Sequence, residues 1–225
     1  GEEGAPIGSE FSVRTGFGGD ASPSVTGLAD GGFIVTWLYI SAGVVSIYGQ
    51  RYTEAGAGIG DEFLIDAHDY SDSVIYYFTP VVAGLEGGGF VVAWEAWPTG
   101  DKDIHARRYD SNGNPLSGEF LVNTYAANEQ SGPAIASLAD GGFVVLWSSW
   151  GQDGSDHGVY GQRYAANGSA AGAEFRVNTT TIYTQYQCAV AGLVNGGFVA
   201  VWSSYGQPGD DMFGVYGQRY DAAGN

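Results

Sequence analysis

Apolar residues along this chain follow the two-residue period of β-strands. In the segment Phe-Val-Val-Leu-Trp at 143–147, the first, third and fifth side chains fall on one side of an extended chain and the second and fourth on the other. Because both sides are apolar, the segment is predicted to be a strand inside a sheet that is packed on both faces. A Leu-Ala-Asp-Gly-Gly turn precedes it, where glycine allows a tight hairpin.

This pattern is repeated. The string Gly-Gly-Phe-x-x-x-Trp occurs four times, at intervals of about 55 residues, and ends at Trp37, Trp94, Trp147 and Trp202. Each copy is preceded by a strand-like segment such as PSVTGL. Each is followed by a segment such as VYGQRY and then by a glycine turn. With a recurring Glu-Phe segment, every unit holds four short strands, which is typical of a β-propeller blade.

The predicted fold is therefore all-β, a β-propeller of four four-stranded antiparallel blades in one domain spanning residues 1–225. Its repeat units are roughly 20–63, 77–120, 130–175 and 185–220, together with 8–14. The last unit lacks a Glu-Phe strand and the first residues supply one, so the N-terminal strand is expected to complete the last blade and close the ring. Alternatively, the chain is a fragment of a longer array of repeats.

The succession GGFVVxW, Gly-Gln-Asp-Gly, VYGQRYD and GxEFxVNT resembles a repeat of very large secreted or surface proteins of bacteria. These proteins often carry RTX-type calcium-binding segments and adhesin-like domains. The resemblance covers nearly the whole chain and implies an extracellular or cell-surface location, but it implies no activity. The chain contains no RTX nonapeptide of its own, so the calcium chemistry of that motif does not carry over.

The net charge of the chain excludes some classes of binding partner. The formal net charge is −17, with only eight basic residues, one lysine and seven arginines. Such a surface repels nucleic-acid phosphates and anionic lipid, so neither nucleic-acid binding nor membrane insertion is expected. The single cysteine, Cys188, permits no internal disulfide and no zinc-type cysteine cluster.

Residues that repeat strictly are interpreted as architecture. Half of all basic residues stand at one repeat position: Arg51, Arg108, Arg163 and Arg219. We expect each arginine to pair with an acid of a neighbouring Glu-Phe strand: Glu10, Glu62, Glu119 or Glu174. A role of the four arginines in gripping a ligand is the alternative.

The candidate binding residues lie in the loop after each core tryptophan, where the repeats differ in sequence but share certain residue types. Aromatic and amide residues recur there: Trp97, Trp150, Tyr205, Gln152 and Gln207. An exposed ring that stacks on a pyranose, beside amides that bind its hydroxyls, is typical of a sugar site. The alternative is that these rings pack against the loop of the adjacent blade.

The same loops are candidates for calcium, which prefers carboxylate and carbonyl oxygens. The candidate ligands are Asp101, Asp103, Asp153, Asp156, Asp210 and Asp211. No EF-hand loop is present, because Pro115 replaces the glycine that the turn at 110–114 would require.

These observations favour a non-catalytic carbohydrate-binding or adhesion domain of a secreted or cell-surface bacterial protein. Its expected partners are glycans or surface polysaccharide, and other domains of the same protein. A structural or protein–protein interaction domain and a polysaccharide-active enzyme are the alternatives. Catalysis is disfavoured because the three histidines join no constellation, and because departures from the repeat are spread over all units.

Overall fold

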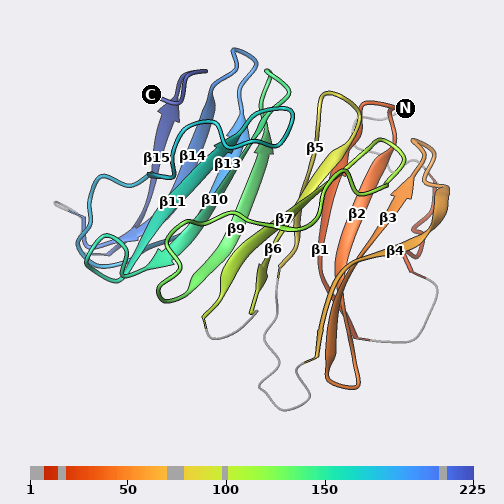
Figure 1. The fold of residues 1–225 in the computed structure, drawn as a ribbon, viewed down its shortest axis with the longest axis horizontal. Helices are drawn as coiled ribbons and strands as arrows, with labels where there is room; N and C mark the ends of the chain where they lie inside the picture. Colours follow the sequence, from red (N-terminus) through yellow and green to blue (C-terminus); the bar gives the residue numbers. More distant parts are fainter. Residues whose placement is uncertain (1–7, 15–18, 70–78, 98–100, 208–211) are drawn as a thin grey trace.

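The computed structural model describes residues 8–14, 19–69, 79–97, 101–207 and 212–225. Within these ranges all regular structure is β, in fifteen strands that form four antiparallel sheets (Figure 1). None of the residues described here forms a helix long and apolar enough to cross a membrane. The all-β prediction is confirmed.

Each sheet takes its strands in chain order, so each is an up-and-down meander. Sheet 1 holds β1 (Gly19–Gly27), β2 (Phe33–Ser41), β3 (Val44–Tyr52) and β4 (Gly58–Asp69). Sheet 2 holds β5 (Val81–Gly84), β6 (Phe90–Ala96), β7 (Asp103–Tyr109) and β8 (Phe120–Leu121). Sheet 3 holds β9 (Gln130–Ser137), β10 (Phe143–Trp150), β11 (His157–Tyr164) and β12 (Phe175–Arg176). Sheet 4 holds β13 (Gln185–Gly192), β14 (Phe198–Tyr205) and β15 (Phe213–Tyr220).

The repeated Gly-Gly has a backbone cause. In sheet 2, Gly88 has a φ of 91°, in the left-handed region that favours glycine. A Cβ added to Gly89 would lie 2.2 Å from the carbonyl oxygen of Tyr109 on the neighbouring strand. The other three sheets show the same two constraints, so the motif marks one turn geometry that is used four times.

Successive sheets pack face to face, and each interface holds a hydrophobic core. Leu38 of sheet 1 packs in one cluster with Trp94 of sheet 2. Ile104 of sheet 2 packs with Trp147 of sheet 3, and Leu146 of sheet 3 packs with Trp202 of sheet 4. The second strands of sheets 2 and 3 therefore each send side chains into two cores, as their two apolar sides predict.

Arg108 and Arg163 connect successive sheets, whereas Arg51 pairs within sheet 1, and none of the three bonds to a repeated glutamate. Arg108 donates to the backbone carbonyls of Ala166 and Asn167, in the turn after the third strand of sheet 3. Arg163 donates in the same way to the carbonyl of Ala222, and Arg51 pairs with Asp30. The expected pairing with a repeated glutamate is thus wrong for Arg51, Arg108 and Arg163. Arg108 and Arg163 bond instead to backbone carbonyls of a turn, beyond the end of the strand that precedes it.

Replacing Arg108 by alanine is expected to lower the free energy of unfolding by about 2 kcal/mol, since two charge-assisted hydrogen bonds are lost. Arg219 holds the same repeat position on the exposed side of sheet 4, and within the described residues it has no polar partner. Arg219→Ala is therefore the matched control, with an expected change below about 0.5 kcal/mol. Urea unfolding measures both, and equal effects would contradict the role of Arg108.

The two ends of the array differ from its interior. Sheet 4 has three strands, and segment 8–14 lies on sheet 1, where Tyr52 donates a hydrogen bond to the carbonyl of Val13. Sheets 1 and 4 stand at opposite ends of the longest axis (Figure 1). The fourfold array of antiparallel sheets is confirmed, while closure of the ring by the N-terminal strand stays a prediction.

Candidate functional site

The loops that were expected to carry chemistry gather along one edge of the array. The connections from β2 to β3 and from β10 to β11 both lie along the lower edge in Figure 1. At this edge, between sheets 2 and 3, a cavity of about 320 Å³ opens to solvent. Its lining residues are Asp101, Asn128, Glu129 and Trp150. We call this cavity the groove.

Glu95 stands behind the groove at the end of β6. It occupies a strand position that Leu38 fills in sheet 1 and Ser148 fills in sheet 3, and it points into the interface of sheets 2 and 3. It is 9% exposed, and its Oε1 accepts a hydrogen bond of 2.7 Å from the backbone N–H of Gly132 on β9. A carboxyl group is thus held in a place that the repeat reserves for apolar or small residues.

Lys102, the only lysine of the chain, lies between two carboxyl groups. Its Nζ is 3.6 Å from Oε2 of Glu95 and 4.0 Å from Oε2 of Glu129. These contacts place the two carboxyl oxygens less than about 8 Å apart, below the upper limit of about 10 Å for the acid pairs of glycosidases. These contacts join β6 and the connection from β6 to β7 in sheet 2 to the segment that precedes β9 in sheet 3.

The environments of the two acids differ. Burial raises the pKa of Glu95, and the nearby charge of Glu129 raises it further, while the hydrogen bond from Gly132 and the charge of Lys102 oppose the rise. The side chain of Glu129 is 52% exposed at the groove. One acid is thus biased toward the protonated form beside another that is open to water, which is the arrangement that general acid–base chemistry needs.

Two of the predicted aromatic residues flank this pair. Trp150 is 46% exposed, lines the groove, and meets the ring of His157 edge-on at 4.7 Å between centroids. Trp97 is half-buried against the core of sheets 1 and 2, with Lys102 Nζ 5.3 Å from its ring centroid. Trp150 therefore offers a face to a ligand, whereas Trp97 supports the lysine.

The other predicted ligand residues lie elsewhere. Tyr205 is 38% exposed at the end of β14, where it contacts Tyr183 and Phe213. Gln152 donates a hydrogen bond to Glu174, and Gln207 bonds to the hydroxyls of Thr180 and Ser204. Both amides are thus engaged in shaping their own loops, and their predicted role in binding stays a prediction.

The predicted calcium ligands do not form one cluster. Asp103 accepts a hydrogen bond from Asn123, Asp153 accepts from Ser155 and Asn178, and Asp156 contacts His157. Asp101 lines the groove, and Asp210 and Asp211 lie outside the described residues. In the part of the chain that the structure describes, no group of three or more His, Cys, Asp or Glu side chains is placed to hold a metal ion. Calcium binding stays a prediction.

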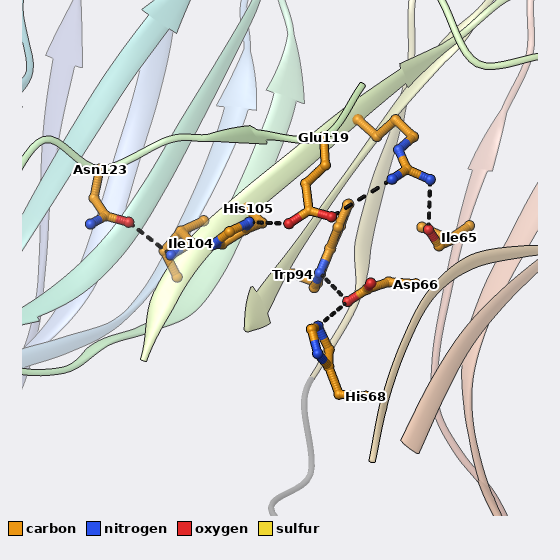
Figure 2. Close-up of polar contacts among 9 residues, drawn as sticks. Ile65, Asp66, His68, Trp94, Ile104, His105, Glu119 and Asn123 are labelled. Carbon is orange, nitrogen blue, oxygen red and sulfur yellow. Dashed lines mark hydrogen bonds and ion pairs between the residues drawn. The ribbon is translucent and has the colours of Figure 1, made fainter. Parts of the chain in front are cut away.

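A second charged cluster lies between sheets 1 and 2 (Figure 2). One carboxylate oxygen of Asp66 accepts a hydrogen bond of 2.9 Å from the indole of Trp94 and lies 2.8 Å from Nε2 of His68. Glu119 contacts Nδ1 of His105, and Arg107 lies 3.6 Å from the same carboxyl group.

The acids of this second cluster are satisfied by neighbouring protein groups. Arg107 also donates a hydrogen bond of 2.8 Å to the carbonyl of Ile65, which joins sheet 2 to sheet 1 (Figure 2). The cluster therefore acts as a polar connection between two sheets, and buried polar groups with their partners in place stabilise such an interface.

Sequence reasoning missed Glu95, Lys102 and Glu129. A signal was present, since Glu95 is charged at a strand position that other units fill with Leu38 or Ser148. Sheet 2 carries further departures of this kind, since His105 replaces a tyrosine and Arg107 replaces a glutamine of the other units.

Comparison with known proteins identifies the fold. No family model and no curated relative matches the sequence. Among solved structures, the chain is similar to xylan β-1,4-xylosidase from Bacillus halodurans, with a TM-score of 0.51 and 13% identity over 91% of this chain and 42% of that one. A glycoside hydrolase is matched with a TM-score of 0.50 and 13% identity, over 90% and 47% of the two chains. Endo-arabinase from Bacteroides thetaiotaomicron is matched at 0.49 and 14%, over 87% and 72%.

These neighbours correct the predicted function. A non-catalytic adhesion domain was expected, with no enzyme activity, but the similar solved structures include a xylan β-1,4-xylosidase and a glycoside hydrolase, which are enzymes. The expectation failed because the repeat indicates only the fold, and a propeller fold occurs in enzymes as well as in binding proteins. At these identities the likeness shows that this chain has the β-propeller type of fold seen in glycoside hydrolases.

Proposed function

We propose that this chain cleaves glycosidic bonds of a carbohydrate polymer at the groove between sheets 2 and 3. The observation that carries the proposal is the buried Glu95, whose pKa is raised by burial, across Lys102 from the exposed Glu129. Two carboxyl groups with different environments are the essential equipment of glycoside hydrolysis. The fold shared with glycoside hydrolases supports the proposal without assigning these residues.

In the proposed reaction Glu95 is the general acid and Glu129 the general base. Glu129 takes a proton from water, whose oxygen attacks the anomeric carbon. The bond from that carbon to the leaving oxygen breaks as Glu95 gives its proton to this oxygen. Lys102 is a positioning residue, because its ammonium contacts both carboxyl groups.

The groove also indicates the kind of sugar. The exposed face of Trp150 suits the apolar face of a pyranose, and the side chains of Asp101 and Asn128 can bind hydroxyls. Two carboxylates at the groove and a net charge of −17 repel polyanions. The expected substrates are therefore neutral polysaccharides rather than polymers of uronic acids.

The first test is the release of reducing ends from a panel of neutral and acidic polysaccharides. Activity on a neutral polymer is expected, and Trp150→Ala is expected to raise KM about tenfold with little change in kcat, since a stacking face is lost. Leu116→Ala is the matched control, because Leu116 is 54% exposed and lies away from the groove. No release from any polymer would overturn the proposed function.

A further inference from the structure

The turn between β5 and β6 lacks an acid that the corresponding turns of sheets 1 and 3 carry. Asp30 and Asp140 stand directly before the repeated Gly-Gly in those sheets, and Gly87 holds the same position in sheet 2. This turn directly precedes β6, whereas Glu95 lies near the end of that strand. A ligand at the turn would therefore be separate from a polysaccharide in the groove.

Both carboxylate oxygens of the turn aspartate are used in sheet 1. Oδ1 of Asp30 accepts a hydrogen bond of 2.9 Å from the backbone N–H of Gly32, and Oδ2 accepts one of 2.8 Å from Arg51. In sheet 3 the equivalent aspartate bonds to its turn glycine at 2.9 Å and lies 3.9 Å from Arg163. The fold thus shows twice how one carboxylate binds between a turn glycine and the repeated arginine.

Sheet 2 keeps both of these donors but not the carboxylate. Gly89 is buried, and among the described residues its N–H has no hydrogen-bond acceptor. Arg108 donates to two backbone carbonyls of sheet 3, but it forms no ion pair with a carboxylate of the described chain. A buried N–H without an acceptor is unfavourable, and burial lowers the pKa of Arg108. Both groups therefore favour an added acceptor with a negative charge.

A cavity of about 520 Å³ opens to solvent at this turn, and its lining includes Leu85, Gly87, Gly89 and Arg108. We call it the turn cavity. A Cβ added to Gly87 would meet nothing within 4 Å. The carboxylate of a small ligand can therefore take the place that the turn aspartate takes in sheets 1 and 3, and the volume is within the range of small-molecule sites.

Two acids limit the charge that a ligand can carry. Glu86 and Asp110 also line the turn cavity, and neither forms an ion pair with Arg108. The carboxylate of Asp110 instead accepts hydrogen bonds from the side chain and the backbone N–H of Asn114, which lower its pKa. Both acids repel a ligand with several negative charges. The turn cavity therefore suits a molecule with a single carboxylate.

We propose that the turn cavity binds the carboxylate of a small monocarboxylic acid. One oxygen would accept the N–H of Gly89 and the other would face the guanidinium of Arg108, as the two oxygens of Asp30 face Gly32 and Arg51. An aliphatic acid and a sugar acid present this same group to the same two donors. Two charge-assisted hydrogen bonds at a site open to water give an expected Kd of about 1 to 10 mM.

An NMR titration that follows the backbone amides tests the site. Propionate and glucuronate are added separately at constant ionic strength, and propionamide and inorganic phosphate serve as probes without a carboxylate. The amide proton of Gly89 is expected to move downfield with at least one of the two acids, since it gains a charged acceptor. The acid that moves it identifies the source of the carboxylate. No movement with either acid, or equal movement with propionamide or phosphate, overturns the proposal.

Two substitutions at Gly87 test where the carboxylate binds. Gly87→Asp supplies the carboxylate from the chain itself, as in sheets 1 and 3, so it should abolish the response of Gly89 to the added acid. It should also raise the midpoint of thermal unfolding by about 2 to 4 °C. Gly87→Ala leaves the turn cavity open and is the matched control, which should bind the acid as the original chain does. Undiminished binding by Gly87→Asp, or an equal loss in both variants, would overturn the proposal.

Discussion

Changing Glu95 to glutamine is expected to lower kcat on the preferred polysaccharide by about a hundredfold to ten-thousandfold, which is the usual contribution of a general acid. Glutamine keeps the oxygen that accepts the N–H of Gly132 but carries no proton to give to the leaving oxygen. Steady-state kinetics on the wild-type chain and the variant measure the effect. Glu86→Gln, at an exposed turn of the same sheet, is the control and should leave kcat unchanged.

The leaving group separates an acid from a merely structural residue. With an aryl glycoside whose phenol leaves without protonation, Glu95→Gln should recover most of its rate, since the acid is no longer needed. The alkaline decline of activity should also disappear in the variant, because the wild-type enzyme loses its acid as pH rises through the pKa of Glu95. An equal loss with both leaving groups would show that Glu95 serves the fold rather than the reaction.

Stability provides a second readout of the same variant. Burial raises the pKa of Glu95, so over the interval between its unfolded and folded values the folded chain binds more protons than the unfolded chain. The free energy of unfolding contributed by this residue therefore falls as pH rises through that interval. Glu95→Gln cannot ionise, so it should match the wild type at acidic pH and exceed it above the interval. Urea unfolding at a series of pH values measures this, and a variant that is weaker at every pH would contradict the raised pKa.

Changing Gly89 to alanine is expected to reduce the free energy of unfolding by about 3 kcal/mol or more. The new methyl group would lie 2.2 Å from the carbonyl oxygen of Tyr109, and a backbone atom in a strand pair cannot move aside as the end of a flexible side chain can. Overpacking of this kind forces a backbone shift. Because the same glycine recurs at 32, 142 and 197 with the same close approach, the effect should be similar in each sheet.

Gly87 supplies the matched control in the same turn. A Cβ at Gly87 meets nothing within 4 Å, and Asp30 and Asp140 show that the repeat accepts a side chain at this position. Gly87→Ala is expected to be neutral or slightly stabilising, since it reduces the freedom of the unfolded chain. Thermal unfolding of both variants decides the matter. A Gly89→Ala variant as stable as Gly87→Ala would show that the strands can separate without loss.

The architecture could be predicted because it follows from short sequence patterns. Two-sided apolar strands, glycine turns and a fourfold repeat require only neighbouring residues to be seen, and they led to four antiparallel sheets. The predicted Arg–Glu pairing was wrong because it concerns a contact between sheets, which local patterns do not show. The partners of Arg108 are backbone carbonyls at 166 and 167, and no pattern of side chains can show where a carbonyl is left without a hydrogen-bond partner.

The candidate site could be predicted only in part from the sequence. Trp150 was identified from its place after the core strand, and the structure places it at the groove. Glu95 was overlooked, although its charge in a packed strand was visible in the sequence. Its relation to Glu129 was not visible, because the two acids belong to different repeat units and meet only through Lys102.

The sequence by itself determined the repeating unit, its strands, its glycine turns and the sign of its surface charge, because these depend on residue type and short spacing. The tertiary structure decided which acids lie close together and which aromatic rings are exposed. These properties depend on how one sheet is placed against the next, and that placement is set by the summed contacts of whole faces. The burial of Glu95 and its contact with Lys102 are the consequences that matter most for function.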